Sequence, residues 1–408
     1  MKKIQPLLYI AFVVMLLISC KKTEEITELK TGFWKGEITA QEQQLPFIFE
    51  INKEQENFKI NLHDGDNIIE LNEVTVKNDS VFFTMHIFDI DVKAKINGNS
   101  LQGTYTKNYA DDYILPFKAT YGIEKRVENE SLSRKFDGKW DVKLHREDGT
   151  DNNTIGIFKT INDQFKGTIM TKTGDYRFLE GYSDEKRFTL YAFDGNHLFV
   201  FKAELESDSI FKGDFWSGKT FHQKFTGMKN QNAELPDPDK LTFLKEGYNR
   251  IEFSFPGLDG NTISLSDEKY QDKVVVIQLF GTWCPNCMDE TKFFNEWFDK
   301  NRDRGVEILG LAYEVKDDYE YAKSRVQKMI DTYDIKYDFA IAGTSDKGNA
   351  AKTLPMLNHV MSFPTSIVID KTGKVRKIHT GFYGPATGDY YLNYVEEFNK
   401  FMDKLLAE

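Results

Sequence analysis

A pair of cysteines at the end of an apolar run is the feature that most constrains the fold of this chain. The run Val274–Phe280 has the composition of a buried strand, and Gly281-Thr282-Trp283-Cys284-Pro285-Asn286-Cys287 follows it directly. Pro285 suits the first position of a helix, because it lacks an amide hydrogen and its φ is already near the helical value. The sequence therefore predicts a strand-to-helix junction at which two thiols can close into a disulfide and reopen.

The two cysteines are expected to differ in role. The start of a helix favours an anion, and the thiolate is the form that attacks disulfides, so we predict that Cys284 is the nucleophile. Cys287 lies one turn further into the helix and suits the resolving thiol, while Trp283 shields the sulfurs. A zinc site is disfavoured, since the sequence has neither a second CxxC nor histidines at finger spacing. We expect no cofactor beyond the redox-active disulfide.

The N-terminus predicts export and lipidation. Two lysines precede a short apolar core at 7–18, which ends in Leu17-Ile18-Ser19-Cys20. This resembles the lipobox of bacterial lipoproteins, which implies a signal peptide at 1–19, acyl chains on Cys20 and a charged tether at 20–31. Several acyl chains give stable anchoring. The resemblance implies a cell-envelope lipoprotein facing the periplasm, and Lys21 favours the outer membrane. An ordinary secretory signal and a transmembrane anchor are the alternatives, the second disfavoured because the apolar run is short.

Cysteine content and charge narrow the possible partners. The chain has three cysteines, so with Cys20 carrying lipid and two in the CxxC motif, no cysteine is left for a structural disulfide. The net charge is −11 and no basic stripe occurs, which argues against nucleic acid.

Residues 32–227 have the pattern of short strands separated by Gly, Asn and Asp clusters. The pattern repeats at an offset of roughly 106 to 110 residues, so that Trp34 aligns with Trp140 and Phe117 falls near Phe225. We predict two tandem all-β domains, 32–122 and 136–228, each an antiparallel meander with a barrel-like or sandwich-like form. The two tryptophans are expected to plug a barrel end rather than contact a ligand.

A linker is predicted at 229–249, where two prolines exclude regular structure. The remaining chain, 250–408, begins with a hairpin and then alternates strands and helices, which predicts an α/β domain. Its expected strands are 274–280, 306–312, 337–342, 365–369 and 375–380, and its expected helices are 285–304, 319–332, 348–358 and 388–406.

Three features of 250–407 together resemble the TlpA/ResA-type thioredoxin-fold oxidoreductases. They are the Cys284 motif, the hairpin at Asp259-Gly260, and Phe363-Pro364 leading into the strand 365–369, which Asp370 and Gly373 follow. The resemblance implies a thioredoxin-like fold with a cis bond between Phe363 and Pro364, facing the cysteines.

The resemblance also implies roles for two residues near the cysteine pair. Glu290 matches the family's glutamate after the second cysteine, and it is expected to exchange a proton with the resolving thiol; the alternative is a solvated first-turn glutamate. Gln278 stands where thioredoxins proper carry a buried acid, and an amide cannot shuttle protons.

The predicted function is a membrane-anchored thiol-disulfide oxidoreductase that reduces protein disulfides outside the cytoplasm and receives electrons from a membrane or periplasmic thiol donor. The reductase direction is implied by the family resemblance, and an oxidase or an isomerase is the alternative. A ligand- or client-binding β-region with an auxiliary redox domain is a second hypothesis. A peroxidase needs Pro-x-x-x-Ser/Thr-x-x-Cys, but Ile277 and Gly281 occupy those positions.

Overall fold

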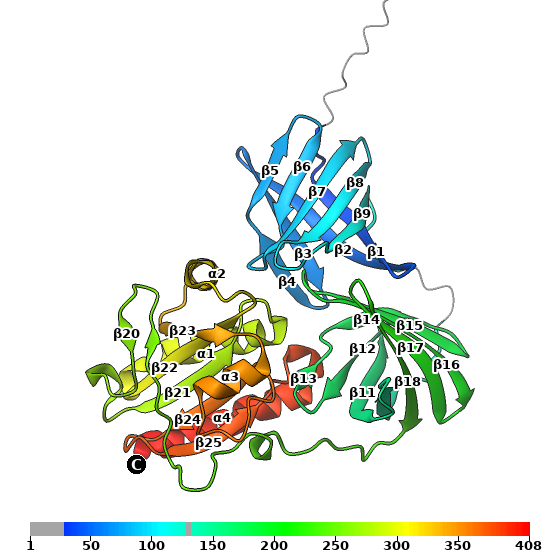
Figure 1. Cartoon of the computed structure of the whole chain (residues 1–408). Coiled ribbons are helices and arrows are strands. Elements are labelled where there is room, and N and C mark those ends of the chain that lie inside the picture. The colour runs from blue at the N-terminus through cyan, green and yellow to red at the C-terminus, as the bar shows by residue number, and fades with distance from the viewer. Residues whose placement is uncertain (1–27, 128–131) are drawn as a thin grey trace, which may run out of the picture.

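The structure is a computed structural model that describes residues 28–127 and 132–408. Figure 1 shows two strand-built bodies and one mixed body, which we call the first β-module (32–121), the second β-module (138–229) and the α/β domain (250–408). Cys20, the signal peptide at 1–19 and most of the predicted tether lie outside the described residues. Across the described part of the chain, no helix is both long and apolar enough to cross a membrane.

The first β-module is a strongly curved antiparallel sheet. Its nine strands within the described residues are hydrogen-bonded in the order β4-β3-β2-β1-β9-β8-β7-β6-β5. The apolar face encloses a core rich in phenylalanine, and the outward residues of β7 alternate with it, as expected for a half-buried strand. The strands are β1 Gly32–Ala40, β2 Gln43–Glu54, β3 Asn57–Asp64, β4 Asn67–Leu71, β5 Val74–Lys77, β6 Ser80–Thr84, β7 Ile90–Asn97, β8 Ser100–Lys107 and β9 Ile114–Tyr121.

The second β-module closes into a barrel. Its strands follow the order β11-β10-β18-β17-β16-β15-β14-β12-β13, and a further ladder joins β11 to β12, which completes the ring. Closure removes the free edges that an open sheet would expose. The strands are β10 Gly138–His145, β11 Asp151–Ile161, β12 Gln164–Thr171, β13 Gly174–Asp175, β14 Leu179–Ser183, β15 Arg187–Phe193, β16 Leu198–Ser207, β17 Ile210–Ser217 and β18 Phe221–Lys229.

The internal repeat is visible in the packing of the two β-modules. Trp34 and Trp140 are fully buried, and each indole N–H donates to a carbonyl four residues earlier, of Lys30 at 3.0 Å and of Phe136 at 2.8 Å. Leu29 is also buried in the first core. The packed chain therefore begins before Gly32, since Leu29 and Lys30, which were predicted to belong to the tether, already contact the first core.

The predicted linker at 229–249 is not a free spacer, because much of it packs on the α/β domain. Asp239 forms an ion pair with Lys377 (2.8 Å) and a hydrogen bond with His379 (2.7 Å), and the hydroxyl of Thr380 donates to that of Thr242. Leu244 bridges to Leu357. Regular structure is not wholly excluded, because Pro238–Lys240 forms a short 3-10 helix that a proline can begin, and side-chain contacts fix the path of the rest.

The α/β domain contains a five-stranded sheet in the order β23-β22-β21-β24-β25, with β21, β22 and β23 parallel and β24 and β25 antiparallel to their neighbours. This is the thioredoxin-like fold that the sequence predicted, preceded by two all-β modules. The strands are β19 Phe255–Pro256, β20 Thr262–Ile263, β21 Val274–Phe280, β22 Val306–Glu314, β23 Asp338–Thr344, β24 Thr365–Ile369 and β25 Val375–Thr380, and the helices are α1 Pro285–Asn301, α2 Tyr319–Tyr333, α3 Lys347–Thr353 and α4 Asp389–Ala407.

Helix α3 is shorter than predicted. The expected helix at 348–358 ends at Thr353, because Leu354 precedes Pro355 and proline disfavours the helical conformation in the residue before it. Leu354 and Leu357 then turn into the core.

Candidate active site

Cys284 and Cys287 lie at the junction of β21 and α1 and form a disulfide. Cys284 is the N-cap of α1, and its Sγ accepts a hydrogen bond from the Cys287 backbone N–H at 3.2 Å. Cys284 is 7% exposed, whereas Cys287 is fully buried. An incoming sulfur can therefore approach Cys284 more readily than Cys287, in line with the roles predicted for the two thiols.

A cis peptide bond joins Phe363 and Pro364, opposite the disulfide. The carbonyl oxygen of Phe363 lies 3.7 Å from Sγ of Cys284, and the carbonyl of Pro364 accepts from the N–H of Gly381 at 2.8 Å. Trp283 packs edge-on against Phe363, and its indole N–H donates to the Tyr313 carbonyl at 2.9 Å. Trp283 thus packs against the residue before the cis proline, and its indole nitrogen is engaged.

Glu290 is fully buried on α1, one turn after Cys287. Its carboxylate accepts from the Gln278 amide at 2.9 Å, and the same amide donates to the Cys287 carbonyl at 3.3 Å. Burial raises the pKa of Glu290 to about 8, although hydrogen bonds from Gln278 and Ser366 oppose the shift. The alternative of a solvated glutamate is wrong, because Glu290 has no exposed surface.

A second buried carboxylate, which was not predicted from the sequence, binds the cysteine loop on the side that precedes Cys284. Glu314, at the end of β22, accepts from the backbone N–H of Thr282 at 2.8 Å and from its hydroxyl at 2.9 Å. Burial raises the pKa of Glu314 to about 7. The sequence feature that could have identified Glu314 is its position at the carboxyl end of a central parallel strand, because ligands bind at that edge of open sheets.

The β-modules reach this site through a buried arginine. Arg177 of the second β-module forms ion pairs with Asp64 of the first at 3.1 Å, with Asp194 of its own module at 3.0 Å, and with Asp289 on α1. Burial raises the pKa of Asp64 to about 7. Burial also acts to raise the pKa of Asp194, but His197 and Arg177 hold it well below its usual range. One guanidinium therefore joins all three bodies beside the cysteine helix.

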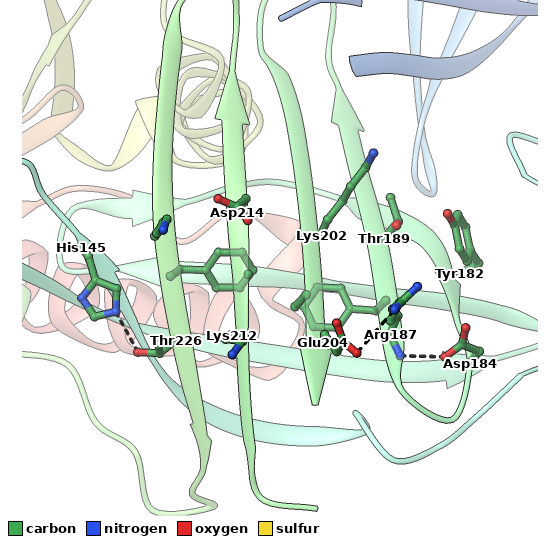
Figure 2. A pocket seen from close by; sticks show the side chains of 15 residues that line it. His145, Tyr182, Asp184, Arg187, Thr189, Lys202, Glu204, Lys212, Asp214 and Thr226 are labelled. Atoms are coloured by element: carbon green, nitrogen blue, oxygen red, sulfur yellow. Dashed lines mark hydrogen bonds and ion pairs between the residues drawn. The ribbon is translucent and has the colours of Figure 1, made fainter. Parts of the chain in front are cut away.

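A separate groove of about 700 Å³ lies on the second β-module. Figure 2 shows its charged floor, in which His145 bonds to Thr226 and Arg187 pairs with Glu204 at 3.5 Å. It contains no cysteine. In the described residues, no group of three or more His, Cys, Asp or Glu side chains is arranged to hold a metal.

The fold and this site define a thioredoxin-fold protein with a dithiol–disulfide centre. The model of the AhpC/TSA family matches residues 247–378. A thiol-disulfide oxidoreductase ResA of Bacillus cereus is 35% identical over 139 residues, which are 34% of this chain and 70% of the relative. ResA of Geobacillus thermodenitrificans is 30% identical over 140 residues, 34% of this chain and 72% of the relative. The chain belongs to the ResA-like thiol-disulfide oxidoreductases, and it is an enzyme of that class.

Solved structures also match this domain. A putative thiol:disulfide interchange protein DsbE from Chlorobium tepidum covers 38% of this chain and 99% of its own, with 22% identity and a TM-score of 0.29. A putative protein disulfide isomerase from Bacteroides thetaiotaomicron covers 41% and 93%, with 19% identity and a TM-score of 0.31.

Proposed function

We propose that this oxidoreductase is anchored by lipid on Cys20, works outside the cytoplasm, and reduces disulfides in client proteins through Cys284. The observation that carries the dithiol mechanism is the arrangement at the start of α1. There a slightly exposed Cys284 caps the helix, a buried Cys287 follows one turn later, and the cis Pro364 lies opposite. A dithiol mechanism needs one sulfur that a client can reach and one sheltered resolving sulfur, and the difference in exposure between Cys284 and Cys287 supports this division.

The reaction begins with the Cys284 thiolate, which attacks one sulfur of a client disulfide and displaces the other as a thiolate. The Cys287 thiolate then attacks Sγ of Cys284, which releases the second client thiol and forms the Cys284–Cys287 disulfide. Two electrons pass to the client, and a thiol donor restores the dithiol. Glu290 exchanges a proton with Cys287: with a pKa of about 8 its carboxyl is mostly protonated near neutral pH, so it is the ionised fraction, which grows as pH rises, that accepts the thiol proton.

A trapping experiment tests the roles of the two cysteines. Cys287→Ser should accumulate mixed disulfides with client proteins on Cys284, visible as bands that disappear with reductant, because no resolving thiol remains. Cys284→Ser is the matched control and should trap nothing. Equal trapping by both variants would contradict the assignment.

The direction of electron flow is tested by the midpoint potential in glutathione buffers. A reductase should have a potential near that of thioredoxin, about −270 mV, and a potential near that of DsbA, about −120 mV, would sink the reductase proposal. The anchor is tested separately: Cys20→Ser should move the protein from the membrane fraction to the soluble fraction.

A peroxidase function has a simple test. We expect no consumption of hydrogen peroxide by the Cys287→Ser variant, because Gly281 and Ile277 replace the hydroxyl and proline that a peroxidatic cysteine needs. Activity that survives in this variant would favour the peroxidase.

The groove on the second β-module supports a second candidate function, the capture of clients. Lys202, Lys212 and Lys224 project there with Glu204 and Asp214, so a polar, extended segment of mixed charge suits the surface. Replacing Lys202 and Lys224 by glutamate should lower the yield of trapped clients if the groove selects them. An unchanged trapping pattern would leave the groove without this role.

A further inference from the structure

The segment that carries Cys284 is held from outside the α/β domain. Two loops of the second β-module reach it, one at 194–197 and one around β13, and Figure 1 shows β13 extending toward the helices of the α/β domain. The first loop contacts Trp283, directly before the nucleophile, and the second contacts Asn286, directly before Cys287. Both ends of the redox motif are therefore fixed by one module.

Asn196 makes the contact at the first end. Its Nδ2 donates to the carbonyl of Trp283 at 2.6 Å, while its Oδ1 accepts from Nζ of Lys107 at 2.6 Å and from the hydroxyl of Tyr109 at 2.8 Å. A lysine ammonium is only a donor, so the oxygen of the amide must face Lys107 and the nitrogen must face Trp283. The first β-module thus fixes the orientation in which Asn196 holds the active-site loop.

Asp175 makes the contact at the second end. Its backbone carbonyl accepts from Nδ2 of Asn286 at 3.1 Å, and its carboxylate accepts from the N–H of Gly384 at 2.8 Å and from that of Arg177 at 2.7 Å. The turn approaches so closely that a Cβ on Gly174 would lie 3.0 Å from Nδ2 of Asn286. The hairpin is therefore fitted against the loop and against the chain after β25.

We infer that Asn196 and Asp175 are positioning residues for the redox reaction, so that the second β-module is a working part of the active site. The inference rests on the proposed dithiol mechanism. The Asn286–Asp175 contact is buried and the Asn196–Trp283 contact is partly buried, and a carbonyl or amide shielded from water costs more than an exposed one when it loses its partner. The contacts are made to the loop in its disulfide form, and the inference is that they stabilise this form more than the dithiol form.

The test is the equilibrium between the Cys284–Cys287 pair and glutathione, measured in the full chain by alkylation and mass spectrometry. Asn196→Asp keeps an oxygen for Lys107 and Tyr109 but turns an oxygen toward the Trp283 carbonyl. Gly174→Ala disturbs the other end, because it strains the hairpin at a φ of +149° and brings a Cβ to 3.0 Å from Nδ2 of Asn286. Each variant should change the equilibrium constant with glutathione at least threefold in favour of the dithiol. For scale, a tenfold change in this constant corresponds to a change of about 30 mV in the reduction potential.

Two controls match these variants. Tyr109→Phe removes one hydrogen bond to Asn196 and leaves Lys107 to hold the orientation of the amide, and Gly32→Ala places a Cβ at a glycine with φ +111° whose nearest neighbour, the Tyr121 ring, is 3.6 Å away. Both should stay close to the wild-type equilibrium. Circular dichroism establishes that each variant is folded, and if Asn196→Asp fails to fold, Gly174→Ala decides.

Wild-type values in both folded test variants would overturn the inference while leaving the proposed function intact. A wild-type pair that does not exchange with glutathione at all would instead overturn the proposed function. A shift of equal size in the controls would also count against the inference, because the effect would then not depend on the loop contacts.

Discussion

Glu290 shows how one side chain links the site to the stability of the domain. It lies fully buried beside Gln278, where an ionised carboxylate is poorly solvated, and its pKa is raised to about 8. Such a group is retained at a cost to folding, which is typical of residues kept for chemistry. Glu290 was identifiable from the sequence through its position after Cys287, but its burial was not, since a charged residue in the first turns of a helix is usually exposed.

The cost of burying Glu290 can be measured. Between pH 4.5 and 8 the folded protein holds a proton on Glu290 that the unfolded chain releases, so its contribution to the free energy of unfolding falls as pH rises. Glu290→Gln removes this dependence. The measurement is the free energy of unfolding in urea. The value for the variant minus the value for wild type should rise by about 2–4 kcal/mol from pH 5 to pH 8.

The matched control is Glu396→Gln on α4, where the carboxylate is exposed and pairs with Lys400. This control should follow the wild-type pH dependence. If Glu290→Gln also ran parallel to wild type, the pKa of Glu290 would be ordinary in the folded protein.

At the level of elements, the short β13 hairpin is the piece that connects the second β-module to the redox loop. Sequence patterns located the strand, helix and turn elements of the α/β domain well, because apolar runs and Gly or Pro punctuation are local signals. They could not locate β13, whose two residues Gly174 and Asp175 have no periodicity of their own. Its conformation is set by contacts with Asn286 and Gly384, more than 100 residues away in the chain.

The tight fit of this hairpin predicts an unequal effect of two similar substitutions. Gly381 has φ +86° and lies against the backbone of Thr173, whereas Gly260 has φ +83° with nothing within 4 Å of its Cβ position. Both Gly→Ala changes strain the backbone alike, but only Gly381→Ala also forces the hairpin away. In chemical denaturation, Gly381→Ala should cost about 1–3 kcal/mol more than Gly260→Ala. Equal costs would mean that the hairpin moves aside freely.

At the scale of the whole molecule, Arg177 ties the three bodies into one unit. The repeat of the two β-modules and the thioredoxin-like domain were both predictable, because each is encoded by patterns within its own segment. The assembly was not, since Arg177, Asp64, Asp194 and Asp289 come from distant segments and look like ordinary polar residues in the sequence. What separates them from ordinary surface residues is that they lie together in the fold, with Arg177, Asp64 and Asp194 buried.

Removal of Arg177 should therefore weaken the whole chain. Arg177→Met leaves the buried Asp64 and Asp194 and the partly buried Asp289 without the cation they share, which is expected to cost about 3–5 kcal/mol and to split a single calorimetric transition into separate module transitions. Arg187→Met, which removes a surface pair with Glu204, should cost less than about 1 kcal/mol. A single unshifted transition for Arg177→Met would show that other contacts hold the modules together.

The contact between Asn286 and the Asp175 carbonyl has a consequence for how this chain can change over evolutionary time. The residues between the cysteines of a CxxC motif are a short route by which such proteins adjust the reactivity of the pair. Here one of those two positions also serves as a docking point for another module. A substitution of Asn286 during evolution would then require matching substitutions in 172–177. The two segments should therefore co-vary among chains that share this three-part architecture.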